Sequence, residues 1–488
     1  MFTVDLGQLE AALIVAGLLL AAGVLASKVS TRLGVPALLL FLGLGMLAGS
    51  EGPGGITFDE EVVAQGVGVL ALAFILFAGG VDTRWKEVRP VLAGGVVLAT
   101  VGVAVTAAVT GLIATLVLDV PLAVGLLIGA TVSSTDAAAV FSVLRSRSIG
   151  LKGRLQPLLE LESGSNDPMA ILLTIGLIEW ITLDGIGPGR AVGFFATQLL
   201  LGLGGGLLVA LLLAWVLRRV HLEQQGLYPV LTVAAVVLAY AGTAMAGGSG
   251  FLAVYVAGLV VGNADVAHKR RLMDFHDAVA WFMQIVLFLV LGLLVFPSRL
   301  VQVAVPAVVI LAALTLLARP VAVLVCLPRG WSMPERGVVA WVGLRGAASI
   351  LLATFPLAAG IDAAGIVFDV VFFVVLLSVL VQGTTIPWVA RRLRVDAPLG
   401  PPEPLAVEAV HEEVSRLQVV ELEVGERSPA AGQRIVELDL PERTLIVLLS
   451  RGDDRAIPQG TTELQPGDQL LVLTDPSDLD DVRRLLSG

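Results

Sequence analysis

The sequence has a single cysteine, Cys326, and few charges: only 15% of its 488 residues are Asp, Glu, Lys or Arg. One thiol can form neither an intramolecular disulfide nor a multi-cysteine metal site, so both are excluded. The scarcity of charge, with 56% hydrophobic residues and a mean hydropathy of +0.91, also excludes an ordinary soluble globular protein. The composition instead predicts a polytopic α-helical membrane protein whose long apolar runs cross the bilayer.

Basic residues are missing from the start of the chain, and acidic residues outnumber them near its end. Residues 1–5 (MFTVD) contain no Lys or Arg before the first apolar run, which favours a retained membrane span over a cleaved signal peptide. Residues 1–396 are neutral overall, whereas residues 397–488 hold 8 Lys and Arg against 18 Asp and Glu, the whole net charge of −10. We therefore expect an acidic soluble tail that does not bind nucleic acid.

Thirteen apolar runs, separated by polar breaks, predict membrane spans. They cover residues 9–26, 35–49, 62–81, 91–118, 121–144, 155–181, 191–217, 227–246, 250–262, 275–296, 300–327, 337–357 and 364–390. The loops on one side carry 19 Lys and Arg residues, and the loops on the other side carry only Arg190 and Arg299. By the positive-inside rule we expect the N-terminus outside and the C-terminal tail in the cytoplasm.

The spans also repeat along the chain. Spans 1–6 and 8–13 begin at matching positions, offset by 209–218 residues. The two shortest runs, 35–49 and 250–262, match each other, as do two runs interrupted by Gly, Ser and Thr, 121–144 and 337–357. Because an odd number of spans separates the copies, the second copy is inverted in the membrane. An inverted repeat with paired interrupted helices is typical of secondary transporters with the antiporter fold, which bind their substrate near mid-bilayer.

The C-terminal part has a different composition. Residues 396–406 are rich in proline and predict a linker after a membrane domain of residues 1–395. Residues 407–488 predict a small cytoplasmic α+β domain. Its expected strands are residues 419–424, 445–450 and 469–474, with a turn at 465–468 and a terminal helix at 475–486. About 80 residues are near the lower limit for an independent core, so dimerisation would help this domain.

Two carboxylates interrupt apolar runs: Asp136 follows the hydroxyl-bearing residues 133–135, and Asp167 precedes Pro168. A charge at mid-bilayer costs roughly 2.5–3.5 kcal/mol on the most lenient scale, so both acids are candidates for function. Asp136 has an alternative interpretation as a simple N-cap of the helix that restarts after it. Pro168 removes an N–H and disfavours helical geometry in Asp167, so we expect a broken helix with free carbonyl oxygens there. Acids beside free oxygens suit a monovalent cation.

Glu162 and Arg345 are further charges in the apolar runs. Neither is stable unpaired in lipid, so we expect them to form a structural ion pair with each other. We expect Glu160 and Arg319 to find other partners or to extend to the membrane surface.

These motifs resemble those of the monovalent cation:proton antiporter superfamily across the whole membrane domain. The matching residues are Thr135-Asp136, Glu162-Ser163, Asn166-Asp167 and Arg345. The resemblance implies the electroneutral branch, because Asn and not a second Asp precedes Asp167. It also implies that Asp167 is the carboxylate that exchanges cation and proton. The further cation/proton-binding residues that it implies are Asp136, Thr135, Ser163 and Asn166. Ala78 stands where the family often carries an acid, which leaves the choice of cation open.

The tail resembles the C-terminal lobe of the regulator-of-potassium-conductance domain, also called TrkA-C-like, in residues 429–432 and 464–470. A membrane body with such a tail is typical of the NhaP-like potassium/proton subgroup. The resemblance implies a homodimer and a regulatory lobe that binds a small ligand between paired copies. Cyclic di-AMP, or another nucleotide, is the candidate ligand.

We therefore expect secondary active exchange of K⁺, or alternatively Na⁺, for H⁺ across a prokaryotic plasma membrane. The protein would be a transporter without enzymatic activity or resident cofactor, with the monovalent cation at Asp167 and Asp136. A gated K⁺ channel is an alternative of a different class, but the sequence has no Thr-Val-Gly-Tyr-Gly-like filter. A non-transporting sensor is a third alternative, which the intact Asp136 and Asp167 disfavour.

Overall fold

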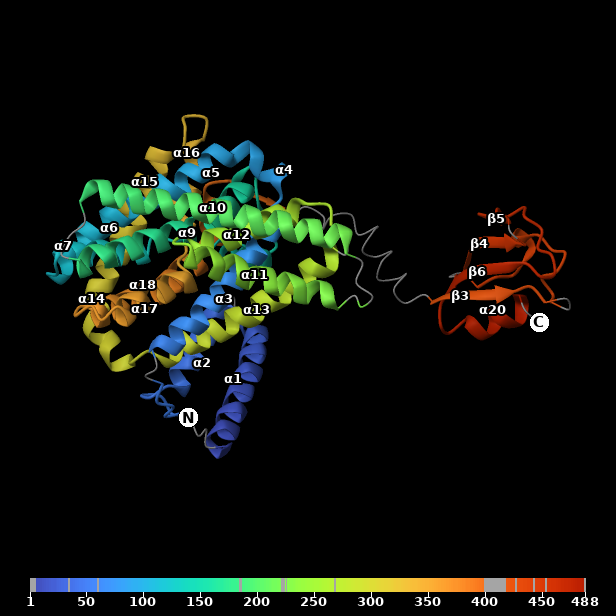
Figure 1. Cartoon of the computed structure of the whole chain (residues 1–488), viewed down its shortest axis with the longest axis horizontal. Coiled ribbons are helices and arrows are strands. Elements are labelled where there is room, and N and C mark those ends of the chain that lie inside the picture. The colour runs from blue at the N-terminus through green and yellow to red at the C-terminus, as the bar shows by residue number, and fades with distance from the viewer. Residues whose placement is uncertain are drawn as a thin grey trace. The chain divides into compact units, whose positions relative to one another are not determined.

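The computed structural model describes residues 6–33, 36–58, 61–183, 187–220, 224, 226–266, 269–398, 418–425, 428–441, 444–452 and 454–486. The chain divides into two compact units, Met1–Leu399 and Gly400–Gly488 (Figure 1). Each unit is described by itself below.

The first unit is mostly helical. In the described residues its helices are α1 (Leu6–Leu33), α2 (Ala37–Ala48), α3 (Glu61–Asp82), α4 (Trp85–Val88), α5 (Leu92–Val97), α6 (Val103–Leu118), α7 (Leu122–Thr131), α8 (Ala137–Ser146), α9 (Leu155–Thr182), α10 (Pro188–Arg219), α11 (Leu227–Met245), α12 (Gly250–Asn263), α13 (Lys269–Leu293), α14 (Pro297–Ala313), α15 (Arg319–Cys326), α16 (Met333–Trp341), α17 (Ala347–Ala358) and α18 (Ala364–Arg392). Figure 1 shows these helices gathered into one bundle.

Seven helical segments among the described residues are long and apolar enough to cross a membrane. They are Val62–Asp82, Trp85–Leu118, Gly189–Arg219, Leu227–Met245, Lys269–Leu293, Pro297–Cys326 and Ala364–Arg392. Other apolar helices, including α2, α7, α8, α12 and α17, are shorter. The helical, multi-pass character of the unit is therefore confirmed, whereas the number of thirteen spans stays a prediction.

Irregular backbone occurs at corresponding places in the two halves of the unit. Non-helical residues 132–136 separate α7 from α8, and residues 342–346 separate α16 from α17. π-helical turns also match, at Leu98–Gly102 and Leu314–Ala318. The interruptions predicted from Gly, Ser and Thr in residues 121–144 and 337–357 are therefore present in the structure.

The expected break at Pro168 was wrong. α9 runs without interruption from Leu155 to Thr182 and holds Asp167 and Pro168 inside it. A membrane helix tolerates an internal proline where packed neighbours cover the irregularity, and α9 packs against α5, α7, α8 and α17. The Gly164 carbonyl still lacks the helical N–H that any other residue at position 168 would donate.

A short antiparallel sheet closes the first unit. Its strands are β1 (Ile149–Leu151), in the connection between α8 and α9, and β2 (Asp396–Pro398), directly after α18. The Lys152 N–H donates to the Val395 carbonyl at 2.9 Å, and the Lys152 ammonium donates to the Arg394 carbonyl at 2.8 Å. The predicted linker at residues 396–406 was therefore wrong in its first three residues, because they pair with β1. Residues 399–406 lie outside the described part.

The second unit is an antiparallel sheet with a helix. The described strands are β3 (Gln418–Glu423), β4 (Leu445–Arg451), β5 (Asp454–Ala456) and β6 (Gln469–Thr474), in the order β3-β6-β4-β5, and α20 (Leu479–Leu486) packs beside β3 (Figure 1). The three predicted strands and the terminal helix are confirmed, and β5 is an additional strand. The predicted turn is also present, with Gly467 at φ 86° and an N–H to carbonyl bond from Asp468 to Gln465. Residues 407–417 lie outside the described part.

Candidate cation and proton site

The two interrupted helices cross at their breaks. The Asp136 N–H donates to the Leu344 carbonyl at 2.7 Å, so the two breaks share a backbone hydrogen bond. Gly346 lies against Asp136 so closely that a Cβ atom there would come within 2.4 Å of Asp136 Oδ2. Only glycine leaves room for the carboxylate at this crossing.

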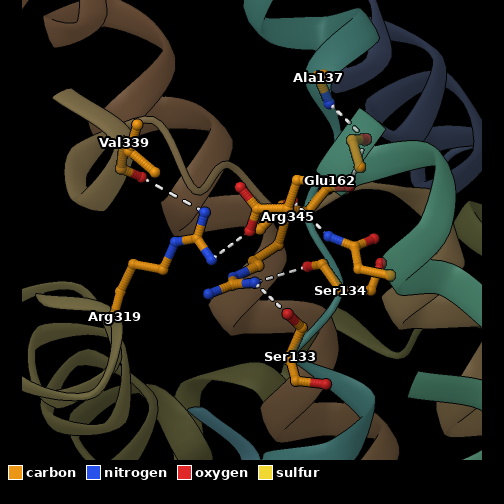
Figure 2. Close-up of polar contacts among 10 residues, drawn as sticks. Ser133, Ser134, Ala137, Glu162, Arg319, Val339 and Arg345 are labelled. Atoms are coloured by element: carbon orange, nitrogen blue, oxygen red, sulfur yellow. Dashed lines mark hydrogen bonds and ion pairs between the residues drawn. The ribbon is translucent and has the colours of Figure 1, made fainter. Parts of the chain in front are cut away.

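Arg345 holds the first break in shape. Its Nη1 atom donates to the carbonyls of Ser133 and Ser134, each at 2.7 Å, and Figure 2 shows the guanidinium directed at both. The side chain is 1% exposed. Backbone carbonyls freed by a helix break cost several kcal/mol in an apolar surrounding unless a donor reaches them. Arg345 is therefore the donor that stabilises the break before Asp136.

Asp136 and Ser163 join the restarted helix to α9. Asp136 Oδ1 accepts the Ala139 N–H at 3.0 Å, which is the predicted N-cap. Ser163 Oγ accepts the Ala137 N–H at 2.9 Å and donates to the Thr135 carbonyl at 2.8 Å. The cap uses one oxygen of Asp136, so the interpretation as a cap and the interpretation as a cation ligand are compatible.

Asp167 faces the same break from α9. Ser134 Oγ donates to Asp167 Oδ1, and the neighbouring Asn166 amide donates to the Thr135 hydroxyl at 2.6 Å. In the described part of the chain neither Asp136 nor Asp167 forms an ion pair. Both acids are thus held by neutral donors and lack a fixed positive partner.

The predicted pair of Glu162 with Arg345 was wrong. Arg319 Nη1 lies 2.5 Å from Glu162 Oε1, and both side chains are buried (Figure 2). Arg319 also donates to the Val339 carbonyl at 3.4 Å. Arg345 donates to the carbonyls of Ser133 and Ser134, so backbone oxygens position it. The Glu162 carboxylate pairs with Arg319 instead. The interpretation of Glu162 as a structural, paired carboxylate is kept, with a different partner.

A cavity of about 500 Å³ contains the two unpaired acids. Of the predicted binding residues, Thr135, Asp136, Ser163 and Asp167 line it. Asn166 is fully buried and is not among the described lining residues, so it acts on the site through Thr135. The cavity continues past Ala78 and Asp82 at the end of α3.

The comparisons with known proteins agree with this geometry. Residues 16–392 match the family described as sodium/hydrogen exchanger, transmembrane, and residues 419–487 match the TrkA-C domain. The chain belongs to the sodium/hydrogen exchanger family. As such it is a membrane transporter, an antiporter for a cation and a proton, and not an enzyme.

Related proteins extend the match. The exchanger is 40% identical to the K(+)/H(+) antiporter NhaP2 of Shewanella baltica, over 99% of this chain and 84% of that protein. It is 39% identical to the K(+)/H(+) antiporter NhaP of Alkalimonas amylolytica, over 98% and 83%. The structure of the sodium proton antiporter MjNhaP1 from Methanocaldococcus jannaschii superposes with a TM-score of 0.70 at 25% identity, over 79% of this chain and 99% of that one.

Several residues of the site were not predicted from the sequence. Ser134 bonds to Asp167, and Gly346 makes room for Asp136. Tyr255 and Asp82 also line the cavity. A charge at the end of an apolar run could have indicated Asp82. No local pattern indicates Gly346 or Tyr255, because their place in the site depends on which helices cross.

Proposed function

We propose that the exchanger transports K⁺ in one direction and H⁺ in the other, one for one, with Asp167 as the carboxylate that both ions share. The names of the two relatives that match nearly the whole of this chain support K⁺ as the transported cation. A Na(+)/H(+) antiporter of Aphanothece halophytica, 27% identical over 65% of this chain, supports Na⁺ as the second candidate.

The observation that carries the proposal is the contrast between Asp167 and Glu162. Glu162 is neutralised permanently by Arg319, whereas Asp167 and Asp136 lie in a cavity without a paired cation. A buried carboxylate without such a partner is stable when a proton or a bound cation removes its charge. Proton and cation therefore compete for Asp167, and this competition is the basis of antiport.

The hydrogen bonds leave few oxygens to the cation. Arg345 occupies the carbonyls of Ser133 and Ser134. The carboxylates of Asp167 and Asp136 remain as the main proposed ligands. The Thr135 carbonyl and the Ser163 hydroxyl, which are bonded to each other, would contribute their remaining lone pairs. Asn166 is neutral and supports Thr135, so it adds no second exchanging proton. One exchanging carboxylate predicts electroneutral transport.

Proteoliposomes test this proposal directly. An imposed pH gradient should drive K⁺ uptake or release without net current, and Na⁺ should substitute less well. Asp167→Asn should abolish exchange, because an amide cannot trade a proton for a cation. Asp362→Asn, at an exposed position, is the matched control. A net current that reverses with the two ion gradients would contradict one-for-one exchange. Such a current is expected of an exchanger with unequal numbers of cations and protons, or of a channel.

We further propose a prokaryotic plasma membrane location, with the N-terminus outside and the tail in the cytoplasm. The distribution of Lys and Arg supports this orientation. The cavity reaches from Asp167 to Arg145 in the last turn of α8, on the basic side. In this proposed orientation, the ion site would be open toward the cytoplasm.

We propose that residues 407–488 regulate transport as a TrkA-C-like domain, after a membrane domain of residues 1–395. Strand β2 supports this, because it is the last described element before the tail and pairs with β1 between α8 and α9. Asp136 is the N-cap of α8, and α9 carries Asp167. The candidate ligand of the tail is cyclic di-AMP or another nucleotide. It would change transport by binding more tightly to one of two conformational states of the exchanger, which the β1–β2 pairing would link to α8 and α9. A homodimer would pair the tails.

Removal of residues 405–488 tests the regulatory part separately. The truncated exchanger should keep K⁺/H⁺ exchange with a changed rate or pH profile. Two results would contradict the regulatory role: a folded truncated protein without any exchange, or one that matches the full chain with every nucleotide added. Neither result would contradict the proposed role of Asp167, which is tested by its own substitution.

A further inference from the structure

A second cavity lies against α10 and α12, which pack side by side (Figure 1). Its volume is about 710 Å³, and it shares no described lining residue with the cavity around Asp167. The groove is lined by Trp85, Leu211, Ala214, Trp215, Arg218, Arg219, Leu259, Val260, Asn263 and Ala264. These residues are called the α10–α12 groove below.

Fixed hydrogen bonds hold the α10–α12 groove open. Asn263 Oδ1 accepts the Trp85 N–H at 2.8 Å, and Asn263 Nδ2 donates to the Thr83 carbonyl at 2.8 Å. Arg218 Nε donates to the Asp265 carbonyl at 2.9 Å. The end of α12 is therefore tied both to the connection after α3 and to the end of α10. A groove fixed on both walls is formed before any ligand arrives.

The groove has an apolar body and a basic end. Leu211, Ala214, Leu259 and Val260 supply aliphatic surface, and two tryptophans flank it, Trp85 at 44% and Trp215 at 58% exposure. Arg218 and Arg219 end α10, which belongs to a segment long and apolar enough to cross a membrane. The groove thus changes from apolar to cationic along a membrane helix.

We propose that the α10–α12 groove binds an acidic phospholipid. One acyl chain would lie on the aliphatic floor, and the phosphate would lie at Arg218 and Arg219. Exposed tryptophans are typical of the membrane–water interface, and basic pockets between membrane helices bind anionic headgroups. Guanidinium groups also fit phosphate through two parallel hydrogen bonds. With the proposed orientation, the lipid belongs to the cytoplasmic leaflet.

Charge and shape together favour a lipid over other occupants. A soluble anion would use the arginines and leave the apolar floor uncovered. A second copy of the chain would have to place an acidic side chain at the arginines and apolar side chains on the floor. An acidic phospholipid supplies both parts in one molecule, and it is already in the surrounding bilayer.

Native mass spectrometry and thermal unfolding of the purified full-length exchanger in detergent test this proposal. Phosphatidylglycerol should remain bound and raise the melting temperature, and phosphatidylcholine of the same chains should do so much less. Arg219→Gln should weaken phosphatidylglycerol binding about fivefold, and Arg218→Gln with Arg219→Gln about 25-fold, at roughly one fivefold factor per arginine. Arg219→Gln alone keeps the Arg218 bond to Asp265, so it separates binding from folding.

Matched controls come from another helix and from the floor. Arg391→Gln with Arg392→Gln removes a basic pair from the last turn of α18 and should leave binding unchanged. Trp215→Ala should weaken both lipids alike, because it removes apolar contact. Equal binding of the two lipids to the unchanged exchanger would overturn the proposal. Equal stabilisation by inorganic phosphate would also overturn it and would indicate a simple anion site. A loss of dimers in Arg219→Gln with no change in lipid binding would overturn it as well, and would indicate that a second copy of the chain occupies the groove.

Discussion

Arg319 neutralises Glu162 inside the membrane unit, with its Nη1 atom 2.5 Å from the carboxylate, while Arg345 holds the carbonyls of the break before Asp136. Two buried arginines near one acid therefore have separate tasks. One compensates a structural charge, and the other shapes the ion site. The division predicts different consequences for the two substitutions.

Arg319→Ala should destabilise the exchanger strongly. It leaves Glu162 buried without its partner, which costs on the order of 3–5 kcal/mol. The measurement is the free energy of unfolding in detergent, and Arg391→Ala at the exposed end of α18 is the control. Glu162→Gln with Arg319→Gln should recover most of the loss, because neither side chain of the pair then carries a charge. A double variant no more stable than Arg319→Ala would contradict the pairing.

Arg345→Gln should impair exchange more than Glu162→Gln with Arg319→Gln does. The amide cannot hold both carbonyls of the break, so Asp136 loses its fixed position beside Asp167. We expect at least a tenfold loss of exchange rate in the folded fraction, measured in proteoliposomes. Equal exchange rates in Arg345→Gln and the double variant would show that Arg345 is structural only.

Gly346→Ala should abolish or greatly slow exchange. The added Cβ atom would come within 2.4 Å of Asp136 Oδ2 and displace the carboxylate from the cavity. Gly365→Ala is the matched control, because a Cβ atom there meets nothing within 4 Å. Cation binding and exchange are measured for both. Unchanged cation affinity in Gly346→Ala would place Asp136 outside the binding site.

Ala397→Pro should uncouple the tail from transport. Lys152 bonds to Val395, and bonded pairs alternate along an antiparallel ladder, so Gly150 and Ala397 are the next bonded pair. Proline removes the N–H of that pair. The pH profile of Ala397→Pro should then approach that of the truncated exchanger, whereas Ala397→Val, which keeps the N–H, should match the full chain. A profile for Ala397→Pro that matches the full chain would rule out the β1–β2 ladder as the connection.

Acid should loosen the tail sheet through Asp468. Arg451 donates two hydrogen bonds of 2.7 Å to its carboxylate, and they hold the pKa of Asp468 below its usual value of 3.8. The stability that the pair contributes is complete above pH 3.8 and is lost as the pH falls through the lower pKa of the folded state. Amide hydrogen exchange in β4 and β6 should therefore accelerate below that pH more in the full chain than in Asp468→Asn. Identical pH dependence in the two proteins would exclude Asp468 as the cause.

Local patterns in the sequence determined the class of the protein and most of its ion site. A carboxylate in an apolar run is visible without any structure, and Asp136 and Asp167 both line the cavity. The hydroxyl run before Asp136 predicted the helix break, because Ser, Thr and Asp compete for backbone hydrogen bonds. Three strands of the tail followed from short runs rich in Val, Ile and Leu, and they lie where they were predicted.

Only the tertiary structure decided which distant groups meet. Glu162 has two arginines within reach of the same region, and helix packing, not sequence spacing, assigns it to Arg319. Pro168 stays inside a helix because packed neighbours hold α9 together. Asp396–Pro398 reads as linker locally, yet it becomes a strand because β1 offers unpaired backbone groups. Each outcome depends on contacts between residues far apart in the chain, and local propensity carries no information about them.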